Sequence, residues 1–229
     1  MIRLHHCHQT RSMRTLWLLH ELEIEFKVAV YPFDQTLRMD AFRALNPIGR
    51  VPALEIDGEV MSETGAITQY LCERFDRFGL GRPAGDLDRM DWLVWVHFAE
   101  TVSQHTAALT QQHIALREDH MRSPIIMQLE AKRLGKCLEA IEGRLSTPVE
   151  KRDYLLTSGF SAADVSVGQA VYMGQHFVRL DAYPETAKWF ERITDRTAFQ
   201  HCLPPADGRL YTRDFYPPWD IDDARCRRD

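Results

Sequence analysis

The stretch Asn46-Pro47-Ile48-Gly49-Arg50-Val51-Pro52-Ala53-Leu54 carries most of the fold information in this 229-residue chain. A helix is expected to end at Asn46, because a residue that precedes proline is disfavoured in the α conformation. A short strand is then expected over residues 51–56. Asp57-Gly58 follows it and predicts a two-residue hairpin turn, since both residue types accept positive φ.

Pro52 lies inside the expected strand, where it would remove a hydrogen-bond donor from the ladder. A cis Val51-Pro52 bond is one resolution, since it would turn the Val51 backbone outward and free it for a ligand. The return strand over residues 59–61 leads into a helix that is expected to begin near Thr64. A helix N-terminus attracts anions, so we expect a carboxylate site beside a backbone edge that can pair with a peptide.

With Ser62-Glu63-Thr64-Gly65-Ala66-Ile67, this stretch resembles the glutathione S-transferase superfamily in the order and spacing of its motifs. The resemblance is close over residues 1–80, and the remainder agrees in length and helical character. It implies an α/β thioredoxin-like domain at 1–80, a linker at 81–86 and an all-helical domain at 87–229 with an extended C-terminal tail. The glycine- and proline-rich composition of residues 78–85 favours the same boundary.

Hydrophobic periodicity indicates a small mixed sheet layered with helices, followed by helices alone. Ser161 with Asp164 forms a capping box, which the superfamily also has on a core helix, so Asp164 is interpreted as structural rather than catalytic. Ser123-Pro124 is interpreted as the start of a helix with a narrow apolar seam over 127–145. The further expected elements are strands at 1–4 and 26–31 and helices at 12–23, 38–45 and 88–112.

Composition excludes several other classes of protein. The net charge of −5 gives no reason to expect nucleic acid or an anionic membrane surface as a partner. No signal-peptide pattern or membrane-length apolar run is visible, and we expect a reducing, cytoplasmic location. The five cysteines lack a Cys-x-x-Cys pair, which argues against a zinc site or a disulfide framework. Cys72, Cys137 and Cys202 are expected to be buried small apolar residues.

Glutathione chemistry requires a thiol with a pKa near 8.5 to be held as a thiolate at neutral pH. A hydroxyl donor at a helix N-terminus favours that anion. Thr10 and Ser12 are the hydroxyls available in the loop at residues 5–14. Alignment from Arg14, by resemblance, places the family's catalytic hydroxyl on Thr10, although serine or tyrosine is usual there. Ser12 is either a second catalytic candidate or the N-cap of the following helix.

Four positions match the family's glutathione site, which the resemblance implies here as well. Thr64 would meet the γ-glutamyl carboxylate and Glu63 its ammonium group. Val51, before the cis-type Pro52, would pair its backbone with the cysteinyl part. Arg50 either reaches the glycyl carboxylate or is a solvated surface residue.

Other chemistry in the same loop is also open. Cys7 could form a mixed disulfide with glutathione in an oxidoreductase, although a partly buried cysteine at a strand end is favoured. His5, His6 and His8 are interpreted as surface-facing residues and not as metal ligands. The histidines at 97, 105, 113 and 120 are expected to share one helix face, too far apart to chelate a metal.

These residues together predict a cytoplasmic, homodimeric glutathione transferase of the detoxification type, with glutathione as co-substrate and no metal. It would direct the glutathione thiolate onto a small apolar electrophile, in a pocket near Trp92, Trp95 and Phe98 or the C-terminal tail. No nucleic-acid or membrane partner is expected. The alternatives are a non-catalytic regulatory or binding protein on the same fold, and a thiol-disulfide oxidoreductase that uses Cys7.

Overall fold

A computed structural model describes residues 1–147 and 152–216 of the chain. Its N-terminal part is a mixed four-stranded sheet in the order β2-β1-β3-β4. Strand β1 (Ile2–His6) runs parallel to β2 (Lys27–Val30) and antiparallel to β3 (Ala53–Ile56), which pairs with β4 (Glu59–Met61). A parallel pair needs a crossover, and α1 (Ser12–Glu21) supplies it. Helix α3 (Thr64–Phe75) follows β4 and packs against α1.

The decisive stretch folds largely as its residues predict. The Val51-Pro52 bond is cis, and Asp57 and Gly58 have φ values of 52° and 89° in the hairpin turn. Strand β3 begins at Ala53 instead of residue 51, however. The expected helix over 38–45 is shorter, consisting of the 3-10 helix η1 (Gln35–Arg38) and α2 (Asp40–Arg43).

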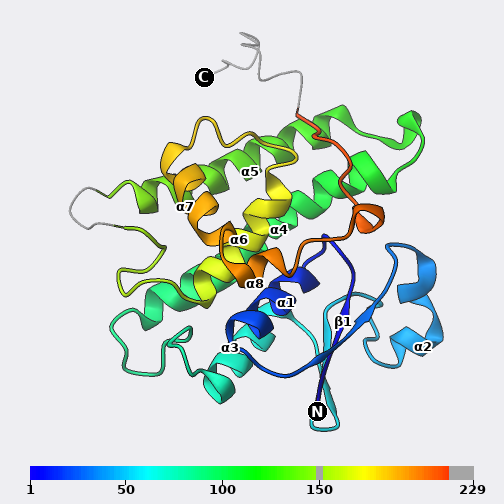
Figure 1. Cartoon of the computed structure of the whole chain (residues 1–229). Coiled ribbons are helices and arrows are strands. Elements are labelled where there is room, and N and C mark those ends of the chain that lie inside the picture. The colour runs from blue at the N-terminus through cyan, green and yellow to red at the C-terminus, as the bar shows by residue number, and fades with distance from the viewer. Residues whose placement is uncertain (148–151, 217–229) are drawn as a thin grey trace.

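The remaining described residues form helices and no strand. Helix α4 (Arg89–Thr110) continues into a π-helical turn, η2 (Gln111–Ala115), and packs against α5 (Pro124–Leu145) and α6 (Ala162–Gly174), as Figure 1 shows. The other elements are η3 (Asp119–Met121), α7 (Pro184–Thr194), α8 (Thr197–Gln200) and η4 (Ala206–Gly208). This is the thioredoxin-like domain joined to a helical domain that the resemblance implies. The division into residues 1–80, 81–86 and 87–229 stays a prediction.

One apolar core joins the sheet layer to the helical layer. Helix α1 contacts α6 and α8, and Trp17 on α1 is completely buried. Helix α6 is buried on nearly every face because its side chains are small. A Cβ at Gly168 would lie 2.4 Å from the Ile193 side chain and 3.2 Å from Trp17, so only glycine lets these elements approach so closely. Both walls of any site between the layers therefore rest on one packed core.

The capping box is confirmed. Ser161 Oγ accepts from the Ala163 N–H at 3.2 Å, and the Asp164 carboxylate accepts from the Ser161 and Leu155 N–H groups, each at 2.9 Å. The indole of Trp189 donates to the same carboxylate at 2.9 Å. The Ser161 hydroxyl adds a longer contact of 3.4 Å. Burial raises the pKa of Asp164 to about 6, but its carboxylate is bonded to these cap and core donors, so its role is structural.

The described part of the C-terminal tail packs against the helices, as expected. Tyr211 is buried and its hydroxyl lies 2.7 Å from Thr110 Oγ1. The Phe215 N–H donates to the carbonyl of His176 at 2.7 Å. Pro217, Pro218 and Trp219, which were expected to belong to this tail, lie outside the described residues.

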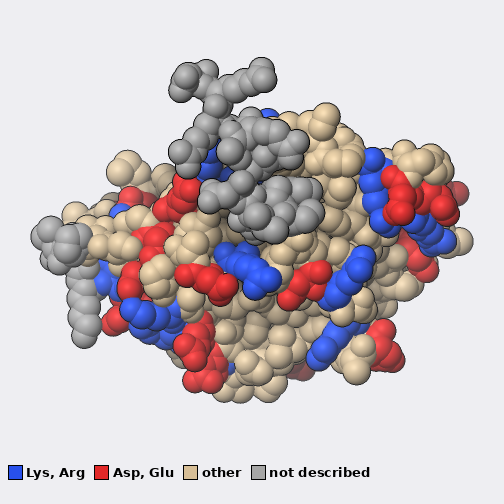
Figure 2. Space-filling view, turned by 90° about the horizontal axis from the view of Figure 1, so that it is seen from above, with Lys and Arg blue, Asp and Glu red and all other residues tan. Residues whose placement is uncertain are grey.

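The charged surface is mixed in sign. Figure 2 shows lysine and arginine side chains interspersed with aspartate and glutamate over the face seen from above. This agrees with the small net charge of −5. Among the described residues, no helix has both the length and the apolar character needed to cross a membrane.

Candidate functional site

Thr10 lies in the loop between β1 and α1, at the carboxyl end of β1. Its side chain is half-buried, and its Oγ1 donates to the Cys7 carbonyl at 2.8 Å. The same oxygen lies 2.9 Å from Ser12 Oγ. In this arrangement a ligand can reach the Thr10 hydroxyl from one side, while the loop holds it from the other.

Ser12 behaves differently from its neighbour. It is the first residue of α1, and Arg11 occupies the N-cap without a side-chain cap bond, so the expectation that Ser12 is the N-cap is wrong. Its side chain is 0% exposed, and its Oγ accepts from the Cys7 N–H at 3.1 Å and lies 2.8 Å from His6 Nδ1. The loop has folded back over the hydroxyl. Thr10 is therefore the less buried of the two hydroxyl residues, and the role of either toward a ligand stays a prediction.

Glu63 and Thr64 lie at the N-terminus of α3, as expected. The first intrahelical bond runs from the Ile67 N–H to the Glu63 carbonyl at 2.9 Å, so the earlier N–H groups form the open end of the helix. Glu63 is exposed, and its φ of 69° is unusual for a residue with a side chain. Thr64 is only 4% exposed, and its hydroxyl is bonded within the protein. The Thr64 backbone, more than its hydroxyl, is thus available to a carboxylate.

A buried guanidinium joins the two sides of this site. Arg14 on α1 donates to Thr64 Oγ1 at 3.0 Å, to Ser103 Oγ at 2.9 Å and to Gln169 Oε1 at 3.3 Å. Gln169 in turn donates from Nε2 to the Thr10 carbonyl at 3.2 Å. Through Arg14 and Gln169, the Thr10 loop is held in a fixed relation to the N-terminus of α3.

Glu100 on α4 is the counterion of this network. It pairs with Arg14, accepts from Thr64 Oγ1, and accepts from Arg11 Nη1 at 3.0 Å. Burial by itself raises the pKa of Glu100, but Arg14, Thr64 and Arg11 outweigh that effect and lower it. Burial lowers the pKa of Arg14, and Glu100 opposes that shift. The pair is thus charged, and each ion stabilises the other.

Sequence reasoning missed Glu100, Ser103 and Gln169. A signal was present, because Glu100 and Ser103 are spaced i, i+3 on a helix whose buried residues are mostly apolar. Gln169 is the long polar residue on a helix of small and apolar ones. Polar residues at buried helical positions usually have partners, but the sequence alone does not reveal which partners they are.

The segment around Val51 forms the edge of the site. Val51 is half-buried and directly precedes β3, while Pro52 is buried. Asn46 Nδ2 donates to the Arg50 carbonyl at 2.7 Å, which shapes the turn at this point. The Arg50 side chain is exposed. The roles of Arg50, Val51, Pro52, Glu63 and Thr64 toward a ligand remain predictions.

Cys7 is a buried residue directly after β1. It is 2% exposed, and burial together with the charge of Asp34 raises the pKa of its thiol to about 11. A thiol with a raised pKa is protonated at neutral pH and is a poor nucleophile. Cys72, Cys137 and Cys202 are also free and buried, as expected.

The expectation that the loop histidines face the surface is wrong for His5 and His6, which are 4% and 1% exposed. His5 Nε2 lies 2.8 Å from Glu55 Oε1, and its Nδ1 lies 2.9 Å from the Tyr31 hydroxyl. These partners satisfy the ring inside the sheet. Among the described residues, no group of three or more histidine, cysteine, aspartate or glutamate side chains could hold a metal.

The second histidine set does not share one helix face. His97 and His105 lie on α4, whereas His113 is in the π-helical turn and His120 is in η3. The π-helical turn changes the register, so the spacing of two turns no longer applies beyond Thr110.

Gln9 fastens the C-terminal segment to the Thr10 loop. Its side-chain oxygen accepts from the Leu210 and Tyr211 N–H groups at 2.7 and 2.9 Å, and its amide donates to the Tyr172 hydroxyl at 3.0 Å. Gln9 is 3% exposed and has a φ of 49°. The sequence had no local pattern to reveal this residue, because its partners are more than 160 positions away.

Of the expected acceptor wall at Trp92, Trp95 and Phe98, the first two are buried, whereas Phe98 is half-buried and its role stays a prediction. Trp92 is completely buried and donates to the Leu80 carbonyl at 2.9 Å, and Trp95 is 9% exposed. Both belong to the core, because α4 packs against several helices. The C-terminal tail was the alternative wall, and its contact through Gln9 brings it next to Thr10.

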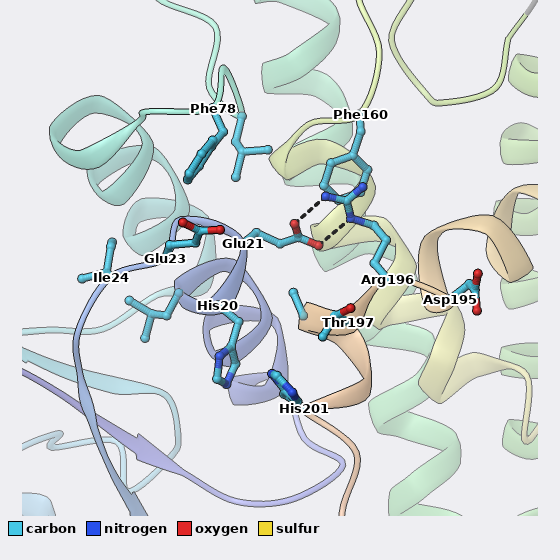
Figure 3. A pocket seen from close by; sticks show the side chains of 13 residues that line it. His20, Glu21, Glu23, Ile24, Phe78, Phe160, Asp195, Arg196, Thr197 and His201 are labelled. Carbon is cyan, nitrogen blue, oxygen red and sulfur yellow. Dashed lines mark hydrogen bonds and ion pairs between the residues drawn. The ribbon is translucent and has the colours of Figure 1, made fainter.

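A hollow lies at the other end of α1. Figure 3 shows this pocket, of about 870 Å³, with the Glu21 and Arg196 side chains joined by two ion-pair contacts of 2.7 Å. His20, Glu23 and His201 also line it. None of the candidate site residues borders this pocket. Size by itself does not identify the site here.

The fold and the site together define a glutathione-binding type of protein, a thioredoxin-like sheet beside a helical domain. The sequence profile of the glutathione S-transferase N-terminal domain matches residues 10–74, and that of the C-terminal domain matches residues 118–197. The chain belongs to the glutathione S-transferase superfamily.

Individual relatives agree with this assignment. Protein LigF of a Sphingobium strain is 28% identical over 229 residues, which cover 82% of this chain and 87% of the relative. Glutathione S-transferase 3 of Schizosaccharomyces pombe is 23% identical over 209 residues, covering 86% and 85%. A solved glutathione transferase homologue from Lodderomyces elongisporus, described with two GSH per subunit, has a TM-score of 0.80 at 22% identity, covering 89% and 99%. The last likeness concerns the fold alone.

Proposed function

We propose that this protein is a glutathione transferase that activates the thiol of glutathione with the Thr10 hydroxyl and directs the thiolate onto a small apolar electrophile. The observation that carries the proposal is the buried Arg14 network. It links the loop that holds Thr10 to the helix end that begins at Thr64. A hydroxyl that can donate to sulfur and a helix end that can bind a carboxylate are thus held at a fixed separation. This arrangement suits a substrate that has both a thiol and a carboxylate.

Glutathione would lie along β3, at the edge between Val51 and α3. The open N–H groups of α3 at Thr64 would bind the γ-glutamyl carboxylate, and the exposed Glu63 carboxylate would bind the ammonium group. The Val51 backbone would pair with the cysteinyl part in the manner of an added strand. Arg50, which is exposed, would reach the glycyl carboxylate.

Activation requires the thiol to lose its proton at neutral pH. A donated hydrogen bond from Thr10 stabilises the thiolate and not the thiol, and so lowers the thiol pKa. The N-terminus of α1 adds its positive dipole end. The proton leaves to water, and the protein's contribution is to hold the sulfur beside the hydroxyl.

The acceptor would enter between the Thr10 loop and the C-terminal segment held by Gln9. Tyr172 is half-buried there and would line the entrance, whereas Gln9 and Tyr211 are each 3% exposed and hold the segment in place. These surroundings favour an apolar or aromatic acceptor. One of the relatives is described as the beta-etherase LigF, so cleavage of an ether is the first reaction to assay beside conjugation.

Two alternatives fit less well. An oxidoreductase would need a reactive Cys7, and that thiol is buried with its pKa raised to about 11. A purely regulatory protein would have no reason to retain an accessible Thr10 beside an intact anion site. A cytoplasmic detoxification role is consistent with these features and forms part of the proposal.

A homodimer is also proposed, and of the two helices that the sequence indicated, at 88–112 and 127–145, the structure favours the first. The apolar seam of α5 packs inside the subunit, since Leu134, Leu138 and Ile141 are completely or almost completely buried. Exposed apolar residues remain on α4, where Met90 is 73% and Val94 is 55% exposed one turn apart. Light scattering should report twice the subunit mass of 26.6 kDa, and a stable monomer would contradict the dimer.

The test combines binding with activity. Glutathione should bind in a calorimetric titration, and Glu63→Ala should weaken its binding by about 1.5–3 kcal/mol. Thr10→Ala should leave binding nearly unchanged but lower turnover about tenfold near neutral pH, since the thiol pKa would rise by about one unit. Glu73→Ala and Thr197→Ala, both exposed and outside the candidate site, are the matched controls. A fully active Thr10→Ala protein would contradict the proposed chemistry.

A further inference from the structure

Behind Thr10, a chain of hydroxyl groups leads to an imidazole ring. Thr10 Oγ1 lies 2.9 Å from Ser12 Oγ, which lies 2.8 Å from Nδ1 of His6. Ser12 and His6 are 0% and 1% exposed, so water does not compete for their hydrogen bonds. Thr10 is half-buried and is the member of the chain that a ligand can reach. The hydrogen bonds within this chain, and not bulk water, therefore set the directions in which the buried Ser12 hydroxyl and the His6 ring donate.

The carbonyl of Cys7 is the competing acceptor in this loop. It accepts from Thr10 Oγ1 at 2.8 Å and from Ser12 Oγ at 3.1 Å. A buried carbonyl needs at least one donor. Thr10 has a single hydroxyl proton, and it must turn away from Cys7 if it is to reach a sulfur atom. Ser12 must then keep its own proton on the Cys7 carbonyl.

The tautomer of His6 decides whether Ser12 can do this. With its proton on Nδ1, His6 donates to Ser12, whose oxygen then accepts from His6 and from the Cys7 N–H at 3.1 Å. The Ser12 proton then has two acceptors, the Cys7 carbonyl at 3.1 Å and Thr10 Oγ1 at 2.9 Å, and it can be shared between them while the Thr10 proton turns to a sulfur atom. With the proton on Nε2, Ser12 would instead donate to His6, and the Cys7 carbonyl would depend on Thr10.

We propose that His6 is a positioning residue for thiol activation. As the Nδ1–H tautomer it holds the Ser12 hydroxyl on the Cys7 carbonyl, and this releases the Thr10 hydroxyl to donate to the sulfur of glutathione. The inference deepens the proposed function and rests on it.

His8 is placed to support that tautomer. Its Nδ1 lies 3.3 Å from Nε2 of His6, which is the nitrogen that lacks a proton in the proposed form. His8 can donate to it. Burial and the neighbouring His8 lower the pKa of His6 to about 3, so the ring is neutral at physiological pH and has one N–H to place.

The direct test reads the tautomer in the unmodified protein. Nitrogen-15 NMR of the full chain distinguishes a protonated Nδ1 from a protonated Nε2, and the His6 signals are assigned by their loss in His6→Asn. Protonated Nδ1 in the glutathione complex is the expected result. Protonated Nε2 would overturn the proposal.

The second test follows the apparent pKa of the bound thiol by its ultraviolet absorbance. His6→Leu removes the donor, and Ser12→Ala removes the hydroxyl that it holds. Each variant should raise the pKa of the bound thiol by about one unit, with little change in the Kd of glutathione. At a pH below the wild-type thiol pKa, this shift is a loss of about tenfold in the thiolate fraction. His6→Asn keeps an N–H near the Nδ1 position and should restore most of the shift.

The outcomes separate the two proposals. If the wild-type protein does not lower the thiol pKa of glutathione, the proposed function fails. If the wild type lowers it but His6→Leu and Ser12→Ala leave it unmoved, only the role of His6 fails. A merely structural role would lower activity equally at every pH without moving the thiol pKa, and that result would also overturn the inference.

Discussion

Helix α1 has a buried guanidinium with many partners at its N-terminal end and an ion pair beside an open hollow at its C-terminal end. The matching at the first end is incomplete, because Arg14 Nε and Thr15 Oγ1 are buried without a hydrogen-bond partner among the described residues. At the first end, Arg14 bonds to side chains from α3, α4 and α6. At the second, Glu21 pairs with Arg196, while His20 and Glu23 line the pocket in Figure 3. The hollow of Figure 3 lies at the second end, away from the Arg14 network. A buried charge is tolerated only with good partners, so the matched network marks the organised site better than cavity size does.

The two ends also differ in how well the backbone suits its residues. The C-terminal end closes with Glu23 N–H on the His20 carbonyl at 3.1 Å and Ile24 N–H on the Leu19 carbonyl at 3.3 Å, which is the Schellman pattern. Glycine usually occupies the position of Glu23, whose φ is 51°. The backbone at the C-terminal end therefore has a conformation that glycine would adopt more easily than Glu23. The hydrogen bonds at the N-terminal end, by contrast, require the particular side chains that are present.

The largest expected effect comes from removing the guanidinium at the matched end. Arg14→Met should lower the free energy of unfolding by about 3–5 kcal/mol, because it leaves the Glu100 charge and several buried acceptors without their main donor. Arg196→Met at the open end is the matched control and should cost about 1–2 kcal/mol, since water reaches that ion pair. Denaturant unfolding measures both. Equal losses would break the comparison between the two ends.

The next effect concerns pH. The pKa of Glu100 is lowered from its ordinary value of 4.5, so the folded state favours the charged form. The stability that this contributes is present above pH 4.5 and is lost as the pH falls below it through the folded pKa. Glu100→Gln should flatten the fall in unfolding free energy in that window and lower stability by about 2 kcal/mol at neutral pH. If the unfolding free energy of Glu100→Gln falls with decreasing pH as steeply as that of the wild type, the charge of Glu100 does not stabilise the fold in this way.

Gln9 tests whether the matched end extends to the C-terminal segment. Gln9→Ala should cost about 1–3 kcal/mol, because the N–H groups of Leu210 and Tyr211 lose their acceptor. Hydrogen exchange should speed up at these two amides well before it does so in α6. Protection that is unchanged at both amides would show that Gln9 does not hold the segment.

The smallest expected effect has the opposite sign. Glu23→Gly should raise the free energy of unfolding by up to about 1 kcal/mol, because glycine adopts positive φ without the Cβ clash. The gain is reduced by the greater freedom of glycine in the unfolded chain. Thermal unfolding at fixed pH measures it, with Glu25→Gly, outside α1 and exposed, as the control that should not stabilise. A loss of stability in Glu23→Gly would mean that the Glu23 side chain makes a stabilising contact that outweighs the cost of its positive φ.

Local features of the fold could be predicted from the sequence because they depend on neighbouring residues. The hairpin turn at Asp57 and Gly58, the start of α3 at Thr64 and the capping box of Ser161 with Asp164 all follow from backbone preferences and short-range hydrogen bonds. The same preferences failed at element ends. Strand β3 starts two residues late, and the helix expected over 38–45 is divided, since boundaries there are set by pairing and not by propensity.

By itself, then, the sequence determined the family, the order of the elements and the positions of Thr10, Glu63 and Thr64 at helix and loop ends. Only the tertiary structure decided that Ser12 and His6 are buried together, that Arg14 joins three helices, and that the large hollow lies away from these residues. The physical reason is the distance along the chain. Arg14 and Gln169 are separated by 155 positions, and whether two such polar groups meet depends on how the packed core brings their helices together.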